Sequence, residues 1–273
     1  MRIERIEGDV MKVNSFLVDA PDGLLLIDGQ LTLTDAATVR RAIGATGVEL
    51  TAAIVTHPHP DHYAGLAAII GDADVPVYAT AAVDEVMRRD DAIKHEIVGQ
   101  LMGEEWPVQR RFADVHVVPG RVARLAGLDI DVVEIGPAES HVDTLWRLDT
   151  GDVFIGDLAY HDHHAYLADG HWKHWLAALT RLESELADDC VLHVGHGASG
   201  AVSLLAAQRR YVEEFVGAIE SHRDAVDAGD HQPVVDAMRG LVTNDDLLFL
   251  MELSIAPVLA TLTETAPSDD RPR

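Results

Sequence analysis

Short apolar runs separated by turn residues predict a chain in which strands and helices alternate. The runs NSFLVD and LLLIDG flank the turn APDG, and because Pro, Asp and Gly favour turns, residues 14–29 are expected to form a β-hairpin. A helical pattern follows over residues 35–47, and a buried strand, AAIVT, then leads into the segment VTHPHPDHYAG. This histidine-rich loop is therefore expected at the carboxyl end of a strand.

The alternation continues beyond the loop. A short helix, AGLAAIIG, and a strand, VPVYAT, come next, and residues 84–107 are predicted to form a helical insertion, with Ile93, Ile97 and Leu101 on one face. Further strands are predicted in DVHVVP, LDIDVVEIG, TLWRLD, DVFIGD and CVLHVGHG, with an amphipathic helix over residues 172–186. The insertion is interpreted either as a lid or as a packed element.

The C-terminal part of the chain is predicted to be helical. Its first helix places five apolar residues on one face: Leu204, Tyr211, Val212, Phe215 and Ile219. Such a face is typical of a core or of a subunit contact. We therefore expect a core over residues 1–200 that includes the insertion, C-terminal helices over 201–265 packed on the core or at a subunit contact, and a disordered tail over 266–273.

Composition and charge narrow the classes of partner. With 273 residues, of which 48% are apolar, the chain is long enough to bury a substantial core. It carries 21 Lys and Arg against 46 Asp and Glu, a net charge of −25 that repels nucleic acid and anionic membranes. A small-molecule substrate is therefore expected, with no nucleic-acid or membrane partner and with a homo-oligomer left open. The acidity indicates either solubility or a high-salt habitat.

The N-terminal stretch MRIERIEGDV does not fit a signal peptide. It has charges where a signal peptide needs an apolar core, and no apolar run in the chain approaches the length of a membrane span. A cytoplasmic location is expected.

The loop HPHPDH, residues 57–62, concentrates the candidate chemistry. A residue before proline is pushed into an extended conformation, so His57 and His59 should both be extended. Because residues two apart in an extended chain point the same way, their imidazoles should meet at one point, as a metal ion requires. Asp61 and His62 begin the next helix and are expected to reach another side of the same cavity.

These residue types favour a metal site over a surface loop. Imidazole and carboxylate groups are ligands of zinc and of iron, and a catalytic site keeps one position open for water. A single histidine here would be read as a surface residue, whereas the full spacing His-x-His-x-Asp-His after an apolar strand points to metal. The loop holds too few ligands for two ions, so partners must come from elsewhere in the chain.

With this motif the sequence resembles the metallo-β-lactamase superfamily of hydrolases, whose hallmark is His-x-His-x-Asp-His after a strand. The resemblance implies an α/β fold, a four-layer αββα sandwich. It also implies three later ligands in a fixed order: a histidine, an aspartate at a strand end and a final histidine. The candidates are His141 in IGPAESHVDT, Asp157 in DVFIGDLAY and His196 in LHVGHGASG.

The resemblance assigns a role to each candidate. It implies that a first metal ion is bound by His57, His59 and His141, and a second by Asp61, His62 and His196. Asp157 would bridge the two ions. Two zinc ions are expected, with iron or manganese as alternatives. A bridging carboxylate offsets the repulsion between two dications, and a water that they share becomes hydroxide near neutral pH. Asp61 would also orient that hydroxide and help to protonate a leaving group.

The third motif departs from the commoner form of the family. AESHVDT stands where a Gly-His pair followed by Ser or Thr and Gly is usual, and HYAG lacks the usual Gly-Gly after the first motif. His141 is thus supported by order alone, and without it the case for a single-metal site becomes stronger. His196 lies between Gly195 and Gly197, which permit close backbone approach. His193 is interpreted as structural.

The segment LAYHDHHAYLADGHW follows Asp157 and is expected to line the mouth of the cavity. Tyr160 and His164 are predicted to contact substrate, because a hydroxyl or an imidazole can hydrogen-bond a developing oxyanion. His161 and His171 are interpreted as solvated loop residues.

The leading functional prediction is a metal-dependent hydrolase of a small ester, thioester, lactone or lactam that uses a metal-bound hydroxide. The alternative is a mononuclear non-haem iron oxygenase on the same fold that acts on a sulfur-containing small molecule; one iron with oxygen uptake would indicate it. Family thioesterases that cleave glutathione conjugates bind an anionic tripeptide through basic residues near the C-terminus. Only Arg209, Arg210 and Arg223 are candidates for that contact here.

Overall fold

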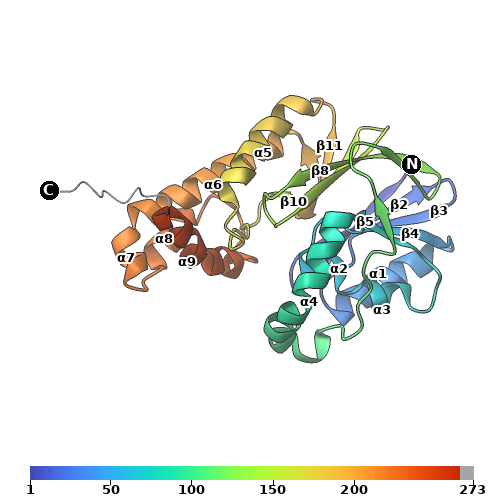
Figure 1. Ribbon diagram of the computed structural model, residues 1–273, viewed down its shortest axis with the longest axis horizontal. Helices are drawn as coiled ribbons and strands as arrows, with labels where there is room; N and C mark the ends of the chain where they lie inside the picture. The colour runs from blue at the N-terminus through green and yellow to red at the C-terminus, as the bar shows by residue number, and fades with distance from the viewer. Residues whose placement is uncertain (265–273) are drawn as a thin grey trace.

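Two β-sheets pack face to face and carry helices on their outer surfaces (Figure 1). The computed structural model describes residues 1–264, so the predicted disordered tail, 266–273, lies outside the described residues. The layers run helix, sheet, sheet, helix. The predicted α/β class and four-layer αββα sandwich are confirmed.

The first sheet is built from the N-terminal part of the chain. In spatial order it holds β1 (Ile3–Glu7), β2 (Asn14–Ala20), β3 (Gly23–Ile27), β4 (Leu50–Ile54), β5 (Val77–Thr80) and β6 (Val115–Val117). The predicted hairpin is the antiparallel pair β2–β3, and β3 to β6 run parallel. The loop of residues 57–62 therefore leaves the carboxyl end of a central strand, β4, where parallel strands present their functional loops.

The second sheet follows in the chain and is mostly antiparallel. It holds β7 (Val122–Leu125), β8 (Leu128–Gly136), β9 (Asp143–Leu148), β10 (Asp152–Tyr160), β11 (Val191–His196) and β12 (Gly200–Ala201), in reverse spatial order. The strands β10 and β11 are parallel, and their register shifts twice between Phe154 and Tyr160. Two site candidates, Asp157 and His196, thus lie on neighbouring strands.

Alternating apolar residues of both sheets form the layer between them. Phe16 and Ile54 contribute from the first sheet, and Trp146 and Phe154 from the second. The rings of Phe16 and Phe154 meet edge to face, with centroids 5.5 Å apart. Trp146 is fully buried, and its indole N–H donates to Thr144 at 2.8 Å. This layer fixes the two sheets against each other.

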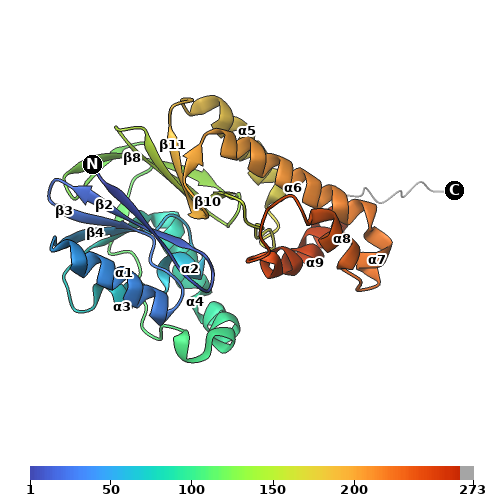
Figure 2. The same ribbon diagram turned by 180° about the vertical axis from the view of Figure 1, so that it is seen from behind.

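Helices cover the outer face of the first sheet (Figure 2). They are α1 (Leu33–Thr46), α2 (Pro60–Tyr63), α3 (Leu66–Ile70) and α4 (Ala81–Met102), the last followed by a 3₁₀ turn (Gly103–Glu105). The helix α1 starts two residues before the predicted boundary because Thr32 caps it by accepting from the backbone N–H of Asp35. The cap of α4 is Thr80, so the predicted insertion begins directly at the end of β5.

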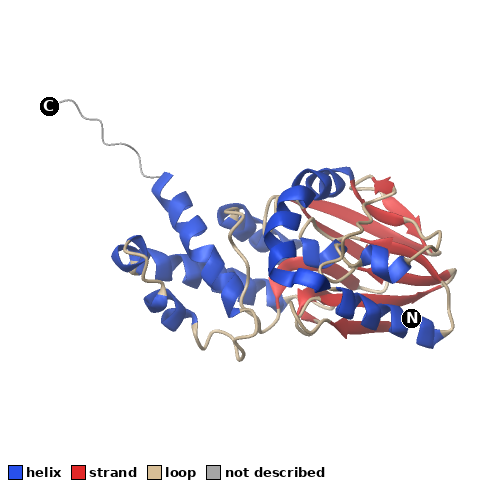
Figure 3. Ribbon diagram, turned by 90° about the horizontal axis from the view of Figure 1, so that it is seen from below, coloured by secondary structure: helices blue, strands red, loops and turns tan. Residues whose placement is uncertain are grey.

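The remaining helices cover the second sheet and extend beyond one end of both sheets (Figure 3). They are α5 (Trp172–Glu185), α6 (Ser203–Ser221), α7 (Arg223–Asp227), α8 (Gln232–Met238) and α9 (Leu248–Glu264). The five residues predicted to share one face of α6 are all buried within this chain. They belong to one apolar cluster with residues of β10, α5 and α9. Within residues 1–264, no helix has the length and apolarity needed to cross a membrane.

The intersheet layer gives a stability prediction. Trp146→Ala leaves a cavity between the sheets, so the free energy of unfolding should fall by about 3–5 kcal/mol, measured by urea denaturation. Val191→Ala, at a position of β11 that is 42% exposed, is the control and should change it by no more than about 0.5 kcal/mol. Equal losses in the two variants would contradict the assignment of Trp146 to the core.

Candidate metal centre

The loop after β4 holds its two leading histidines as the prolines dictate. His59 is extended, with φ −77° and ψ 141°, and Pro60 occupies the first turn of α2. The rings of His57 and His59 are buried and lie 5.0 Å apart between centroids. Both imidazoles therefore reach the same side of the loop, as the sequence predicts.

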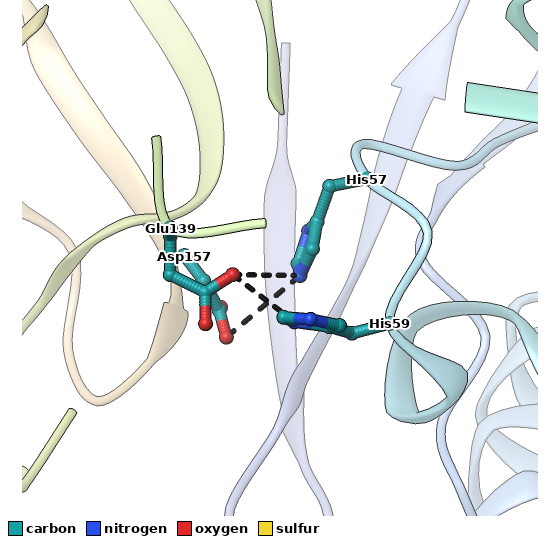
Figure 4. A group of neighbouring side chains, drawn as sticks. All are labelled: His57, His59, Glu139 and Asp157. Carbon is teal, nitrogen blue, oxygen red and sulfur yellow. Dashed lines mark ion pairs between the residues drawn. The ribbon is translucent and has the colours of Figure 1, made fainter. Parts of the chain in front are cut away.

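A first group of four potential ligands surrounds these imidazoles: His57, His59, Glu139 and Asp157 (Figure 4). Their ligand atoms all lie within 4.8 Å of one another, and all four side chains are buried. Glu139 Oε2 is 3.0 Å from His59 Nδ1 and 3.7 Å from His57 Nε2. Asp157 Oδ2 is 3.9 Å from His57 Nε2. Spacings of this size leave room for one ion among the four groups.

A second group lies beside the first and contains Asp61, His62 and His196. Asp61 Oδ2 is 3.5 Å from His196 Nε2 and 3.8 Å from His62 Nε2. Asp157 also faces this group, since its Oδ1 is 3.4 Å from His62 Nε2 and its Oδ2 is 3.1 Å from His196 Nε2. One carboxylate thus lies between two sets of ligands, which is the geometry of a bridging residue.

Buried atoms without partners show that the two groups fit metal ions. Among residues 1–264, the buried polar atoms that lack a hydrogen-bond partner include His57 Nε2, His62 Nε2, His196 Nε2, Glu139 Oε2 and Asp157 Oδ1. Burying a polar atom unpaired costs roughly 1–3 kcal/mol, and more if it is charged. A cluster of such atoms, all facing each other, is explained by cations that accept their lone pairs.

The electrostatics of the cluster also favour cations. Burial raises the pKa of Glu139 to about 8, although His59 beside it acts in the opposite direction. Burial opposes ionisation of Asp157 as well, but His196 and His62 outweigh burial and hold its pKa well below the usual range. A dication at the first group would lower the pKa of Glu139 in the same way.

Two further carboxylates orient the ligating imidazoles. His62 Nδ1 donates to Asp28 at 2.8 Å, and His59 Nε2 donates to Asp169 at 3.2 Å. In metal sites the second ring nitrogen of a ligating histidine usually donates to a carboxylate or carbonyl in this way, which fixes its tautomer. Sequence reasoning did not identify Asp28 or Asp169. Asp28 ends the predicted hairpin, a strand-end position that offered a signal, whereas Asp169 lies in an irregular loop that offered none.

The structure does not bring His141 into the ligand groups, and Glu139 lies there instead. His141 is 41% exposed, and its Nδ1 is 2.8 Å from Nε2 of His171. Glu139 is buried, and its Oε1 lies 3.2 Å from the hydroxyl oxygen of Tyr160. The order of ligands in the family motif predicts His141 at this position. In the structure the buried carboxylate of Glu139, two residues earlier, lies there instead. The first group therefore holds two histidines and two carboxylates.

Tyr160 and His164, the two predicted substrate contacts, lie in different surroundings. Tyr160 lines the cavity above the ligand groups, donates to Asp157 at 2.7 Å, and stacks on His196 with ring centroids 4.9 Å apart. Its only proton is thus directed to a ligand. His164 is fully buried beside Tyr211, 2.9 Å from that hydroxyl, and is not part of the cavity lining. The observed contacts favour Tyr160 as a positioning residue and His164 as a structural one.

His193 has the structural surroundings expected of it. Its Nδ1 is 2.8 Å from the hydroxyl of Ser199, and its Nε2 is 2.8 Å from Asp152. Ser, His and Asp are the residue types of a nucleophilic triad, but none of these three lines the cavity of the metal cluster. We interpret the group as a link between the starts of β10 and β12.

Comparison with known proteins agrees with this geometry. The sequence model of the metallo-beta-lactamase superfamily matches residues 8–196. A hydroxyacylglutathione hydrolase from Methylobacterium nodulans is 29% identical over 153 residues, which are 50% of this chain and 59% of that protein. Another, from Cupriavidus taiwanensis, is 30% identical over 132 residues, 46% of this chain and 47% of that protein. The matches thus span about half the length of these curated relatives.

Solved structures share the fold, including its C-terminal helices. A beta-lactamase domain protein from Burkholderia ambifaria superposes with a TM-score of 0.70 at 16% identity, over 97% of this chain and 87% of that one. A double mutant of the sec-alkyl sulfatase PisA1 superposes with a TM-score of 0.67 at 15% identity, over 100% of this chain and 50% of that one. At such identities the likeness concerns the fold alone.

A glycine beside the cluster gives a test of its geometry. A methyl group at Gly195 would overlap Asp157 Oδ1 and lie 2.8 Å from the ring of His62, so Gly195→Ala must displace a ligand. We expect the variant to keep its circular-dichroism spectrum and to lose at least one metal ion per chain, measured by elemental analysis.

Gly217→Ala is the matched control, because open space surrounds that position in α6. It should retain full metal content and gain about 0.5–1 kcal/mol of stability from the higher helix propensity of Ala. Full metal content in Gly195→Ala would show that the two ligand groups are not arranged as described.

Proposed function

We propose that this chain, which belongs to the metallo-β-lactamase superfamily, is a two-metal hydrolase of a small carboxylic ester or thioester. The observation that carries the proposal is the position of Asp157 between two buried ligand groups, several of whose facing atoms lack hydrogen-bond partners. Lactones and lactams are the alternative substrates. The hydroxyacylglutathione hydrolases among the relatives support thioesters first.

Each ligand group would hold one ion. The first group would use His57, His59 and Glu139, the second Asp61, His62 and His196, and Asp157 would contact both ions. When bound, two such ions acidify a water molecule and polarise a carbonyl. Asp61 lines the cavity beside the second group, so its carboxylate is placed to orient water and to hold a proton for the leaving group.

Glu139 changes the expected metal. A first group of two imidazoles and two carboxylates is harder than the expected three imidazoles and one carboxylate, and harder ligands favour iron or manganese relative to zinc. Two histidines with one carboxylate are also the ligand set of mononuclear iron oxygenases, so the oxygenase remains the second candidate. The second ligand group favours the hydrolase, because a single ion at the first group would leave His62 and His196 buried without a cation to bind.

The surroundings of the site argue against an anionic tripeptide as the substrate. The three arginines considered for such a contact, Arg209, Arg210 and Arg223, do not line the cavity of the ligand groups. Arg209 instead forms ion pairs with Glu183 and Glu213. Among the described residues, Lys94 is the one lysine or arginine that lines this cavity.

The decisive experiment combines metal analysis with a substrate panel. Protein purified without added metal should contain two ions per chain and should hydrolyse chromogenic esters or thioesters without consuming oxygen. A chelator should abolish turnover, and added iron, manganese or zinc should restore it to different extents. One iron per chain with oxygen uptake would favour the oxygenase. The panel should include lactones, a β-lactam and an alkyl sulfate.

Two single substitutions, one at each candidate for the third ligand of the first group, test this group directly. Glu139→Gln should lose one ion per chain and at least about 100-fold in kcat/KM, since even groups that only orient ligands contribute 10- to 100-fold. His141→Gln, two residues away and partly exposed, is the matched control and should keep both ions. Loss of metal in His141→Gln but not in Glu139→Gln would reverse the assignment.

A further inference from the structure

The cavity above the ligand groups has one polar end and one apolar wall. Its volume is about 230 Å³, and metal-ligand candidates such as Asp61 and His196 line the polar end. The apolar wall comes from two helices that are far apart in the sequence: Ile97, Val98 and Leu101 of α4, and Phe249, Leu250 and Leu253 of α9. Figures 1 and 2 show α4 and α9 on either side of the carboxyl end of β10, and residues of both helices line the cavity.

The apolar residues of this wall are unusually exposed. Leu101 is 73% exposed, Leu253 58%, Ile97 56% and Phe249 43%. Single exposed apolar side chains are normal on a protein surface, but a cluster that rims a cavity marks a binding site. Because the same cavity reaches the ligand groups, a molecule bound against this wall is in contact with the reaction site.

We propose that the substrate carries a medium-length aliphatic acyl tail, which lies between α4 and α9 while its ester or thioester carbonyl lies at the ligand groups. This inference rests on the proposed hydrolase function and names its substrate class. The tail would cover the exposed apolar side chains, and each buried methylene contributes about 0.8 kcal/mol of transfer free energy, or roughly fourfold in affinity.

Charge supports an uncharged tail in this part of the cavity. The chain carries a net charge of −25, so an anionic group needs a local basic residue to bind. Within residues 1–264, Lys94 is the one lysine or arginine that lines the cavity. A single lysine provides little side-chain positive charge for a polyanionic substrate, whereas an aliphatic tail requires none.

The size of the cavity limits the tail. Ligand sites of drug-sized molecules occupy about 300–1,000 Å³. A volume of about 230 Å³ is below that range, so a long chain would emerge between the two helices into solvent. We therefore expect the benefit of added methylenes to level off at medium length.

The test is a chain-length series on the metal-loaded protein. p-Nitrophenyl esters from acetyl to dodecanoyl should show kcat/KM rising about two- to fourfold per added methylene and then levelling off. Ile97→Asp and Leu253→Asp should each lower the octanoyl-to-acetyl ratio of kcat/KM at least tenfold.

The matched control is one helical turn away. Ile93 is 48% exposed on the same helix α4 but does not line the cavity. Ile93→Asp should keep both the acetyl rate and the chain-length dependence. A flat chain-length profile in the wild type, or equal effects of the substitutions at Ile93 and Ile97, would overturn the inference while leaving ester hydrolysis intact.

A binding measurement tests the apolar tail site independently of the proposed hydrolysis. Decanoate should bind the metal-loaded protein at least about 50-fold more tightly than acetate in calorimetry, and Ile97→Asp should remove most of that difference. This holds whether or not any ester is hydrolysed. Equal affinities would refute the apolar tail. So would a concentration-dependent dimer that Ile97→Asp dissociates, because a second copy would then cover the apolar wall.

Discussion

The position of Asp157 between two sets of histidines is the constraint on which the site depends. Its carboxylate lies within 3.9 Å of imidazole nitrogens from His57, His62 and His196. These histidines come from a loop of the first sheet and a strand of the second. The imidazole nitrogens present lone pairs and the carboxylates present negative charge to one another, so cations on both sides of the Asp157 carboxylate would hold these groups together. The two sheets must therefore meet closely at this point.

Two glycines make that close approach possible. Gly156, directly before Asp157, has φ +51°, and a methyl group there would lie 2.6 Å from the hydroxyl of Thr56 and 2.9 Å from the ring of His57. Gly195 leaves the space that the carboxylate of Asp157 occupies. The register of β10 against β11 shifts on both sides of Gly156. The irregular strand thus exists because the loop of the first sheet has to fit against it.

Sequence patterns predict the parts of the molecule that depend on local periodicity. The segment LDIDVVEIG has the bounds of β8, and the prolines of HPHPDH place two imidazoles together, because both effects act within a few residues. The third ligand position depends instead on which side chain of the segment AESHVDT is buried, and this is decided by distant partners such as Tyr160. The same holds for Asp169, whose role arises only when its loop folds over His59.

The ligand groups and the apolar wall come from different layers of the structure. The ligand groups lie on the segment after β4, on the segment between β8 and β9 and on the strands β10 and β11, where the packing of two sheets fixes them. The wall comes from α4, an insertion of the first half of the chain, and from α9, which lies beyond the residues matched to the superfamily. The exposed side chains of these helices, such as Leu101 and Leu253, do not belong to the ligand groups. The wall can therefore change in sequence without altering the residues of the ligand groups.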